Sequence, residues 1–322
     1  MRAGYMPAVG AAEFRDDMPE PQIGKADDVK IKIHNCGICG SEVHAYHGLH
    51  PFRIPPIVSG HELSGEAHYG CGECWYCKHG LYDVCPNKKV LGSFDWSGAL
   101  GEYVVVPEKT VMRLPEKLTY EEGALIEPIA NGMYAVRNSK IDAETNIVVI
   151  GCGPIGIGDY LCAKLYGPKN ILMVDVSDFN LEKARDMGAT LTCNSRRENL
   201  YDRVMELTDG VGADIVFLGF GDAPTIQQAV EICRRGGQLV QHALMEDGIA
   251  FPYRVHQQHE LDFKAYNMYT YEDFELIANA INEGRMDLSK FVTQRYPIEQ
   301  FAEAMHMADK RPEPVLKVMM YF

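Results

Sequence analysis

The sequence lacks the segments that would place it in or across a membrane. No apolar run reaches about 18 residues, the length that a membrane-spanning helix requires. The first residues, MRAGYMPAVGAAEFRDD, contain no continuous apolar stretch, so we expect no signal peptide and a cytoplasmic protein. Low-complexity segments and internal repeats are also missing. The 322 residues therefore predict a globular protein of roughly two domains.

Positive charge is also scarce. The chain has 31 lysines and arginines against 45 aspartates and glutamates, which gives a formal net charge of -14 at pH 7. Nucleic acids and anionic membranes both attract basic surfaces, so this balance argues against them as main partners. We therefore expect a small-molecule substrate and neither a nucleic-acid nor a membrane partner.

Cysteine, by contrast, is abundant, and four of the ten cysteines fall in the stretch GCGECWYCKHGLYDVC. They are Cys71, Cys74, Cys77 and Cys85. Because we expect a reducing compartment, clustered cysteines indicate metal ligands rather than disulfides. Two-residue gaps let one turn direct several sulfur atoms to one point, and a fourth thiolate closes a tetrahedral zinc shell. A redox pair and uncoordinated thiols are the alternatives, although the surrounding pattern is not that of a thioredoxin.

A zinc ion with four protein ligands has no place for substrate, so the chemistry must be sought elsewhere. Three further segments carry ligand types: NCGICGSEVHAYHG, IVSGHELSGE and GALIEPIANGMYAV. Their candidate ligands are Cys39, His61, Glu62 and Glu127. A thiolate, an imidazole and carboxylates make an open zinc site with a position for water or an alcohol oxygen. Each segment taken singly has an alternative interpretation. The cysteine would be a small core residue, and the His-Glu pair would lie at the surface or be hydrogen-bonded without a metal.

From residue 146 onward, predicted strands alternate with predicted helices. The segment NIVVIGCGPIGIGDYLCAKLYG indicates a buried strand, a glycine turn and a helix that ends near Gly167. Further strands are expected in NILMVDV, at 213–220 and at 236–243, with a helix in NLEKARDMGA after the first of them. This alternation is typical of an α/β fold with a parallel, doubly wound Rossmann sheet.

The glycine turn has the pattern of a dinucleotide-binding site. Gly151 allows the tight turn, Gly153 lets a pyrophosphate approach the backbone, and Gly156 lets helix and strand pack closely. The pyrophosphate would lie at the helix N-terminus, whose free N–H groups favour an anion. Asp175 ends the next strand and is expected to bind the adenosine ribose. A 2'-phosphate would meet this carboxylate, so NAD is favoured over NADP; a glycine turn without cofactor is the alternative.

Together these motifs resemble the zinc-containing medium-chain dehydrogenase/reductase family over nearly the whole chain. The resemblance implies a GroES-like, β-barrel-type catalytic domain at 1–137 and 273–322, with a structural zinc lobe at 71–85. It also implies an NAD-binding Rossmann domain at 138–272. As partners it implies an alcohol substrate and a second copy of the chain, in a homodimer or homotetramer.

The family's site residues can be assigned position by position. The catalytic-zinc positions are matched by Cys39, His61 and Glu62, and the structural-zinc positions by the four lobe cysteines. Glu127 matches a position that is cysteine in simple alcohol dehydrogenases and acidic in the polyol and threonine branches. Ser41 and His44 match proton-relay positions, although a turn-capping hydroxyl and a solvated loop histidine are the alternatives.

The implied reaction is hydride transfer to NAD from a secondary alcohol, with a polyol or sugar derivative as the expected substrate. Zinc would lower the pKa of the substrate hydroxyl, and the relay residues would carry its proton to solvent. Threonine or an amino alcohol is the alternative substrate class. A degenerate member that binds NAD without turnover is a second alternative. A zinc-ribbon nucleic-acid module is a third, disfavoured by the charge and the Rossmann pattern.

One departure from the family pattern is large. Only residues 63–70 separate Glu62 from Cys71, whereas family members carry a longer connection with a VGDRV-like strand that completes the barrel. We therefore expect an incomplete barrel, unless the sequence itself omits a segment. A smaller departure is Glu42, which stands where aspartate is usual.

Overall fold

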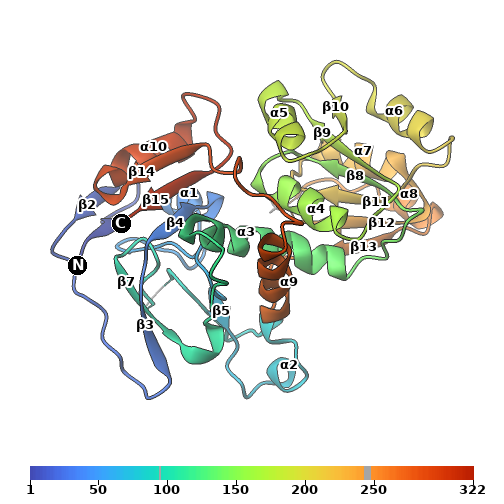
Figure 1. Ribbon diagram of the computed structural model, residues 1–322. Coiled ribbons are helices and arrows are strands. Elements are labelled where there is room, and N and C mark those ends of the chain that lie inside the picture. The colour runs from blue at the N-terminus through green and yellow to red at the C-terminus, as the bar shows by residue number, and fades with distance from the viewer. Residues whose placement is uncertain (94–95, 243–247) are drawn as a thin grey trace. The chain divides into compact units, whose positions relative to one another are not determined.

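Figure 1 shows the computed structural model of the chain, which describes residues 1–93, 96–242 and 248–322. The chain forms two compact units. Unit 1 comprises Met1–Glu127, Thr270–Gly284 and Phe291–Phe322, and unit 2 comprises Pro128–Tyr269 and Arg285–Lys290. The assignment of 1–137 and 273–322 to a catalytic domain and of 138–272 to a cofactor domain stays a prediction.

Unit 2 contains a six-stranded sheet in which every neighbouring pair of strands is parallel. Its strands are β8 (Asn146–Ile150), β9 (Asn170–Asp175), β10 (Leu191–Asn194), β11 (Ala213–Leu218), β12 (Cys233–Gln241) and β13 (Asp262–Ala265). Their spatial order is β10-β9-β8-β11-β12-β13, the 3-2-1-4-5-6 order of dinucleotide-binding sheets. The predicted doubly wound sheet is confirmed, and Ala243, predicted to end a strand, lies outside the described residues.

Helices pack on opposite faces of this sheet. They are α4 (Pro154–Lys164), α5 (Asp178–Asp186), α6 (Leu200–Leu207), α7 (Ala223–Ile232) and α8 (Tyr253–Gln258). Val148 of β8 belongs to the same apolar cluster as Val204 of α6. The next residue, Val149, points the other way, and its side chain lies 3.3 Å from the place of a Cβ on Gly156 of α4. The glycine turn therefore sits between β8 and a helix that covers one face.

The strands of unit 1 fall into four small sheets within the described ranges. They are β1 (Ala3–Tyr5) with β2 (Glu13–Arg15), β3 (Asp28–Lys32) with β7 (Tyr103–Pro107), β5 (His68–Tyr69) with β6 (Lys89–Val90), and β4 (Asn35–Ile38) with β15 (Val318–Tyr321) and β14 (Gln294–Pro297). Isolated bridges add further pairing, such as Gly37 of β4 with Glu62 and Gly65 with Val111. The barrel-type architecture is thus built from short sheets rather than from one continuous wall.

The short connection at 63–70 packs into unit 1. The Glu66 N–H donates to the carbonyl of Thr110 at 2.9 Å. Gly65 has a φ of +148°, and a Cβ there would lie 2.8 Å from the same carbonyl oxygen. Leu63 is buried in the apolar core of this unit. The connection therefore contributes both backbone pairing and core packing.

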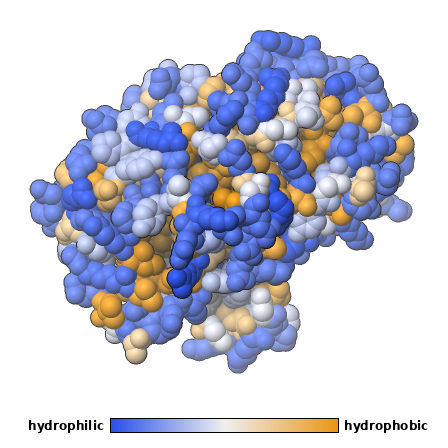
Figure 2. All heavy atoms as spheres, in the orientation of Figure 1, coloured by the Kyte–Doolittle hydropathy of each residue, from blue (hydrophilic) through white to orange (hydrophobic). Residues whose placement is uncertain are grey.

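The helices of unit 1 are mostly short. They are α1 (Gly40–Tyr46), α2 (Trp75–Lys78), α9 (Tyr271–Asn282) and α10 (Phe301–Lys310), with 3-10 turns η1 (Tyr82–Val84), η2 (Glu108–Thr110) and η3 (Ile298–Gln300). The longer α3 (Tyr120–Arg137) begins in unit 1 and ends in unit 2. Hydrophilic residues predominate on the face that Figure 2 shows. Among the described helices, none is long and apolar enough to cross a bilayer.

Candidate functional site

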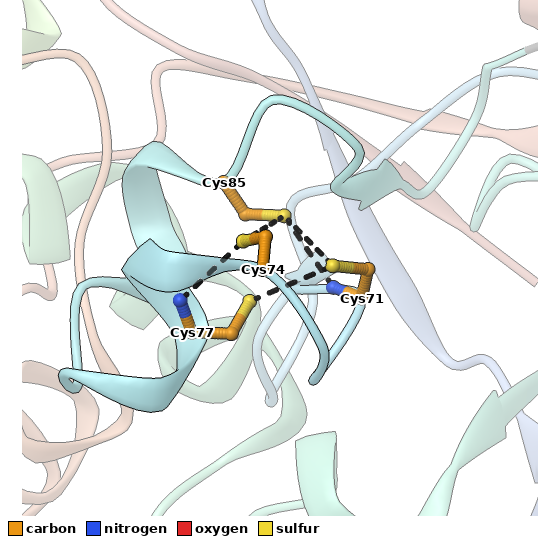
Figure 3. Close-up of side chains that lie close together, drawn as sticks. All are labelled: Cys71, Cys74, Cys77 and Cys85. Carbon is orange, nitrogen blue, oxygen red and sulfur yellow. Dashed lines mark hydrogen bonds between the residues drawn. The ribbon is translucent and has the colours of Figure 1, made fainter.

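The four predicted cysteines lie together on one loop of unit 1, which we call the cysteine lobe (residues 71–85; Figure 3). None of them forms a disulfide. The sulfur of Cys85 lies 3.6 Å from that of Cys71 and 3.7 Å from that of Cys74, and the sulfurs of Cys71 and Cys77 are 4.0 Å apart. A tetrahedral ion with zinc–sulfur bonds of about 2.3 Å separates its ligands by about 3.8 Å. The spacing therefore fits a zinc ion.

The backbone of the lobe favours a thiolate. Hydrogen bonds from the backbone N–H groups of Glu73 and Cys74 lower the pKa of Cys71 to about 6. Gly70 leaves the space that the sulfurs occupy, because a Cβ there would lie 2.5 Å from the sulfur of Cys77. Since zinc binds the deprotonated thiol, these features suit a metal rather than a disulfide.

A second group of ligand atoms lies at the start of α1, and we call it the open centre. Ligand atoms of Cys39, Glu42 and His61 all lie within 4.8 Å of one another. Cys39 is the N-cap of α1 and Glu42 is its third residue, and the Cys39 N–H donates to Glu42 Oε2 at 3.1 Å. This capping box brings a thiol and a carboxylate together at one helix end.

Glu42 is a member of this group that the sequence analysis noted only as a departure. Its Oε1 lies 3.0 Å from His61 Nδ1, and the Gly60 N–H donates to the same oxygen at 3.3 Å. Burial raises the pKa of the Glu42 carboxyl, but His61 and Arg53 outweigh burial and hold it at about 2. A carboxylate on Nδ1 directs Nε2 of the ring toward a metal. The sequence signal for Glu42 is the Cys-x-x-Glu spacing at the start of a helix.

Glu62 is not in the close group of ligands. Its Oε1 lies 2.5 Å from the Nζ of Lys317, and both side chains are buried. Gly37 makes room for the carboxylate, because a Cβ there would lie 1.7 Å from Glu62 Oε2. The zinc-ligand role of Glu62 stays a prediction, and Lys317 is a partner that the sequence analysis missed.

Glu127 is buried on α3 and acts on the same groups. Burial lowers the pKa values of His61 and Lys317, but acidic neighbours outweigh burial and raise both, and Glu127 contributes to each rise. Glu127 thus lies within electrostatic reach of the open centre, although outside its closest group. A thiolate, an imidazole and a carboxylate are the donor set of an open zinc site.

Ser41 and His44 lie three residues apart on α1, and such residues are neighbours on one helix face. Ser41 is half-buried, and its hydroxyl has no hydrogen-bond partner in the described part of the chain. His44 is exposed to solvent. A polar pair that leads from the interior to water is the arrangement that a proton relay requires, and this role stays a prediction.

In the glycine turn of unit 2, the geometry explains why glycine stands at each of the three positions. Gly151 has a φ of +97°, which favours glycine. A Cβ on Gly156 would lie 1.8 Å from the carbonyl oxygen of Gly151, so no other residue fits there. A Cβ on Gly153, the N-cap of α4, would meet nothing within 4 Å. The backbone at this helix N-terminus is therefore open to an anionic ligand.

Asp175 at the end of β9 is fixed beside this turn. Its Oδ2 accepts from the Cys152 N–H at 2.7 Å and from Asn180 Nδ2 at 3.1 Å. Its Oδ1 accepts from the Ser177 N–H at 2.8 Å. The half-buried carboxylate is thus held next to the glycine turn, where a ribose with free hydroxyls could donate to it.

Two protein families match the chain. Residues 154–283 match the family described as zinc-binding dehydrogenase. Residues 25–68 and 66–116 match the alcohol dehydrogenase GroES-like domain. The second match is split at residues 66–68, inside the short connection that precedes the cysteine lobe.

Relatives and solved structures agree with these matches. The sorbitol dehydrogenase of Bacillus subtilis is 30% identical and aligns with 95% of this chain and 93% of its own. The D-xylulose reductase A of Aspergillus niger is 30% identical over 86% of this chain and 85% of its own. An Escherichia coli oxidoreductase of unknown specificity, 27% identical, superimposes with a TM-score of 0.93 over 99% of this chain and 98% of its own.

Proposed function

The chain belongs to the zinc-containing medium-chain dehydrogenase/reductase family, and from this membership we propose that it oxidises a secondary alcohol of a polyol or sugar derivative with NAD. One observation carries the proposal. The chain holds both a thiol–imidazole centre, with half-buried Cys39 and buried His61, and an open glycine turn, with Gly153. A protein that binds NAD without turnover has no use for the thiol–imidazole centre.

The residues of unit 1 divide the work of the reaction. Cys39, His61 and Glu127 would hold the zinc ion, with Glu62 as the further predicted ligand, and Glu42 would fix the ring of His61. Zinc, when bound, supplies a Lewis acid that lowers the pKa of the substrate hydroxyl, and the nicotinamide supplies the hydride acceptor. Ser41 would take up the proton that the hydroxyl loses. The exposed His44 would pass it to solvent.

The cysteine lobe and the glycine turn have separate tasks. The lobe would hold a second, structural zinc ion away from the chemistry, because four thiolates fill its coordination shell. The glycine turn would bind the pyrophosphate of NAD. Asp175 supports NAD over NADP, since its fixed carboxylate would repel a 2'-phosphate. A cation could attract a 2'-phosphate, but Arg197, just after β10, already forms an ion pair with Asp178 at 2.5 Å.

The test follows NAD+ reduction by absorbance with polyols, sugar alcohols, simple alcohols and threonine, with and without a chelator. We expect turnover with a polyol or sugar alcohol that the chelator abolishes. Turnover with threonine alone would move the proposal to the alternative substrate class. NADH binding without turnover on any alcohol would contradict a dehydrogenase of this class.

A point variant tests the assignment of Glu127. Glu127→Ala removes a carboxylate from the open centre, so we expect a large loss of kcat and of bound zinc. Glu144→Ala is the control, because Glu144 is exposed and lies in neither metal site. Unchanged turnover of Glu127→Ala would show that the assigned role is wrong.

We also propose a homodimer or homotetramer in the cytoplasm, with unit 1 as the catalytic and unit 2 as the cofactor domain. Family membership supports the oligomer and the division of labour. None of the ten cysteines forms a disulfide and four of them are grouped as metal ligands, which supports a reducing compartment. Light scattering of the purified protein tests the oligomeric state, and a monomeric mass would contradict it.

A further inference from the structure

A buried carboxylate lies on the helix that begins at the glycine turn. Asp159 of α4 is fully buried, and its Oδ1 lies 2.9 Å from Nδ1 of His242. The His242 side chain is only 3% exposed. Both residues belong to unit 2, and they join the dinucleotide helix to the residue that follows β12.

This pair is costly to bury. Burial raises the pKa of the Asp159 carboxyl, and His242 offsets that rise only in part. In the described part of the chain, both carboxylate oxygens of Asp159 and both ring nitrogens of His242 lack a hydrogen bond of good geometry, so the 2.9 Å contact joins them as an ion pair. Apolar residues of similar volume are often as stable as a buried charged pair, or more stable. Stability alone therefore gives no reason for a titratable pair at this place.

The surrounding backbone is shaped to accommodate the carboxylate. Gly132 of α3 lies against it, and a Cβ on Gly132 would be 3.1 Å from Asp159 Oδ1 and 2.8 Å from the carbonyl carbon of Gly158. A larger residue would push α3 away from α4. Two helices and one strand end thus converge on one polar contact.

The position of His242 relates the pair to the cofactor. In a sheet of this strand order, one nucleotide of a dinucleotide lies over the carboxyl ends of the first three strands and the other over the last three. The glycine turn and Asp175 follow β8 and β9, which places the adenosine in the first half. β12 is the middle strand of the second half, and His242 follows it. The nicotinamide half of NAD would therefore lie at the strand end that His242 fixes.

Two backbone hydrogen bonds between described residues lie at this strand end. The His242 N–H donates to the carbonyl of Leu218 at 3.1 Å, and the Tyr266 N–H donates to the carbonyl of Gln241 at 3.0 Å. These bonds tie the end of β12 to its two neighbouring strands. The side-chain contact with Asp159 adds a third tie, directed to the helix that holds the pyrophosphate.

We propose that Asp159 and His242 form a buried positioning pair that holds the end of β12 in the conformation that the nicotinamide half of NAD requires. The inference rests on the proposed NAD-linked function. Neither side chain is a catalytic residue, because both are buried and act through the backbone that they hold. The pair links the two nucleotide-binding halves through α4.

The test compares two ligands by calorimetry on the purified full chain. NADH spans both halves of the site, whereas ADP-ribose lacks the nicotinamide. We expect Asp159→Asn to weaken NADH binding about tenfold while ADP-ribose binding stays within about twofold of the wild type. Tyr160→Phe is the matched control, a buried polar change on the same helix that should alter neither affinity.

Two further variants keep the test decisive. Asp159→Ala combined with His242→Leu replaces the pair by apolar groups, so it should fold as well as the wild type. We expect it to lose NADH affinity selectively. The single variant His242→Asn keeps a donor near the place of Nδ1. Its NADH affinity should therefore lie between that of the double variant and that of the wild type. Wild-type NADH binding by the double variant would overturn the proposal.

Two other outcomes distinguish a failure of the positioning role from a failure of the NAD-linked function. Equal loss of NADH and ADP-ribose affinity would show a merely structural pair and overturn the positioning role. Wild-type protein that binds neither ligand would refute the NAD-linked function itself, and the inference with it.

Discussion

The two candidate metal centres of unit 1 are built differently. The cysteine lobe takes its four ligands from residues 71–85, and three of the four cysteines are partly exposed. The open centre takes its groups from distant segments and buries Glu42 with Arg53, and next to His61 the chain buries Glu62 with Lys317. Hence the metal itself must order the lobe, whereas ion pairs hold the open centre together before any metal arrives.

Removal of the lobe's metal should give the largest effect on stability. A structural zinc ion contributes its binding free energy to folding, so Cys74→Ser should lower the free energy of unfolding by ~5 kcal/mol or more. Thermal unfolding and metal analysis of the purified variant would measure this. Cys39→Ser, which removes a ligand of the open centre, is the comparison. An equal loss of stability in both variants would break the contrast between the centres.

The next effect should come from the ion pair of Glu62 and Lys317 beside the open centre. Lys317→Met leaves the buried carboxylate of Glu62 without its cation, which costs ~3–5 kcal/mol. Urea unfolding of the metal-free variant would measure it. Adding Glu62→Gln removes the stranded charge, so the double variant should regain most of the stability. If single and double variants unfold alike, the pair does not hold the centre.

The smallest effect depends on pH and concerns the contact between the lobe and the rest of unit 1. The Tyr82 hydroxyl donates to Glu66 Oε1 at 2.6 Å, and the Tyr271 N–H donates to that hydroxyl at 2.9 Å. Burial raises the pKa of Glu66 from 4.5 to about 7. Because the folded pKa is the higher one, ionisation of Glu66 costs stability. The cost is absent below pH 4.5, grows up to about pH 7 and is constant above it.

The variant Glu66→Gln should remove this cost. We expect the free energy of unfolding of the wild type, relative to this variant, to fall by ~2–3 kcal/mol between pH 4.5 and pH 7. Urea unfolding at several pH values measures the difference. The exposed change Glu144→Gln should give a flat profile. A flat profile for Glu66→Gln as well would show that burial does not perturb this carboxyl.

The parts of the site that the sequence predicts are those whose atoms meet through local chain geometry. Cys71 to Cys85 span a single loop, and Gly151 to Gly156 span a single turn, so spacing alone places them. The ion pair between Glu62 and Lys317 joins residues 255 positions apart. It depends on how β15 pairs with β4, and no local pattern reports that register.

The same distinction applies to the fold. Strands β8, β9 and β11 of unit 2 are evident because buried parallel strands form continuous apolar runs. The strands of unit 1 are only two to five residues long, as β5 (His68–Tyr69) and β7 (Tyr103–Pro107) illustrate. Such short strands leave too few alternations for a pattern, and their pairing follows from tertiary packing.

The separation of Glu62 and Lys317 has a consequence during protein synthesis. At about 5–20 residues per second, a ribosome needs about 13–50 s to add the 255 residues between them. The cysteine lobe is complete as soon as residue 85 has emerged, so it can capture zinc on the nascent chain. Beside the open centre, Glu62 must wait without its cation until Lys317 and β15 are made. The two metal ions would thus be loaded in a fixed order.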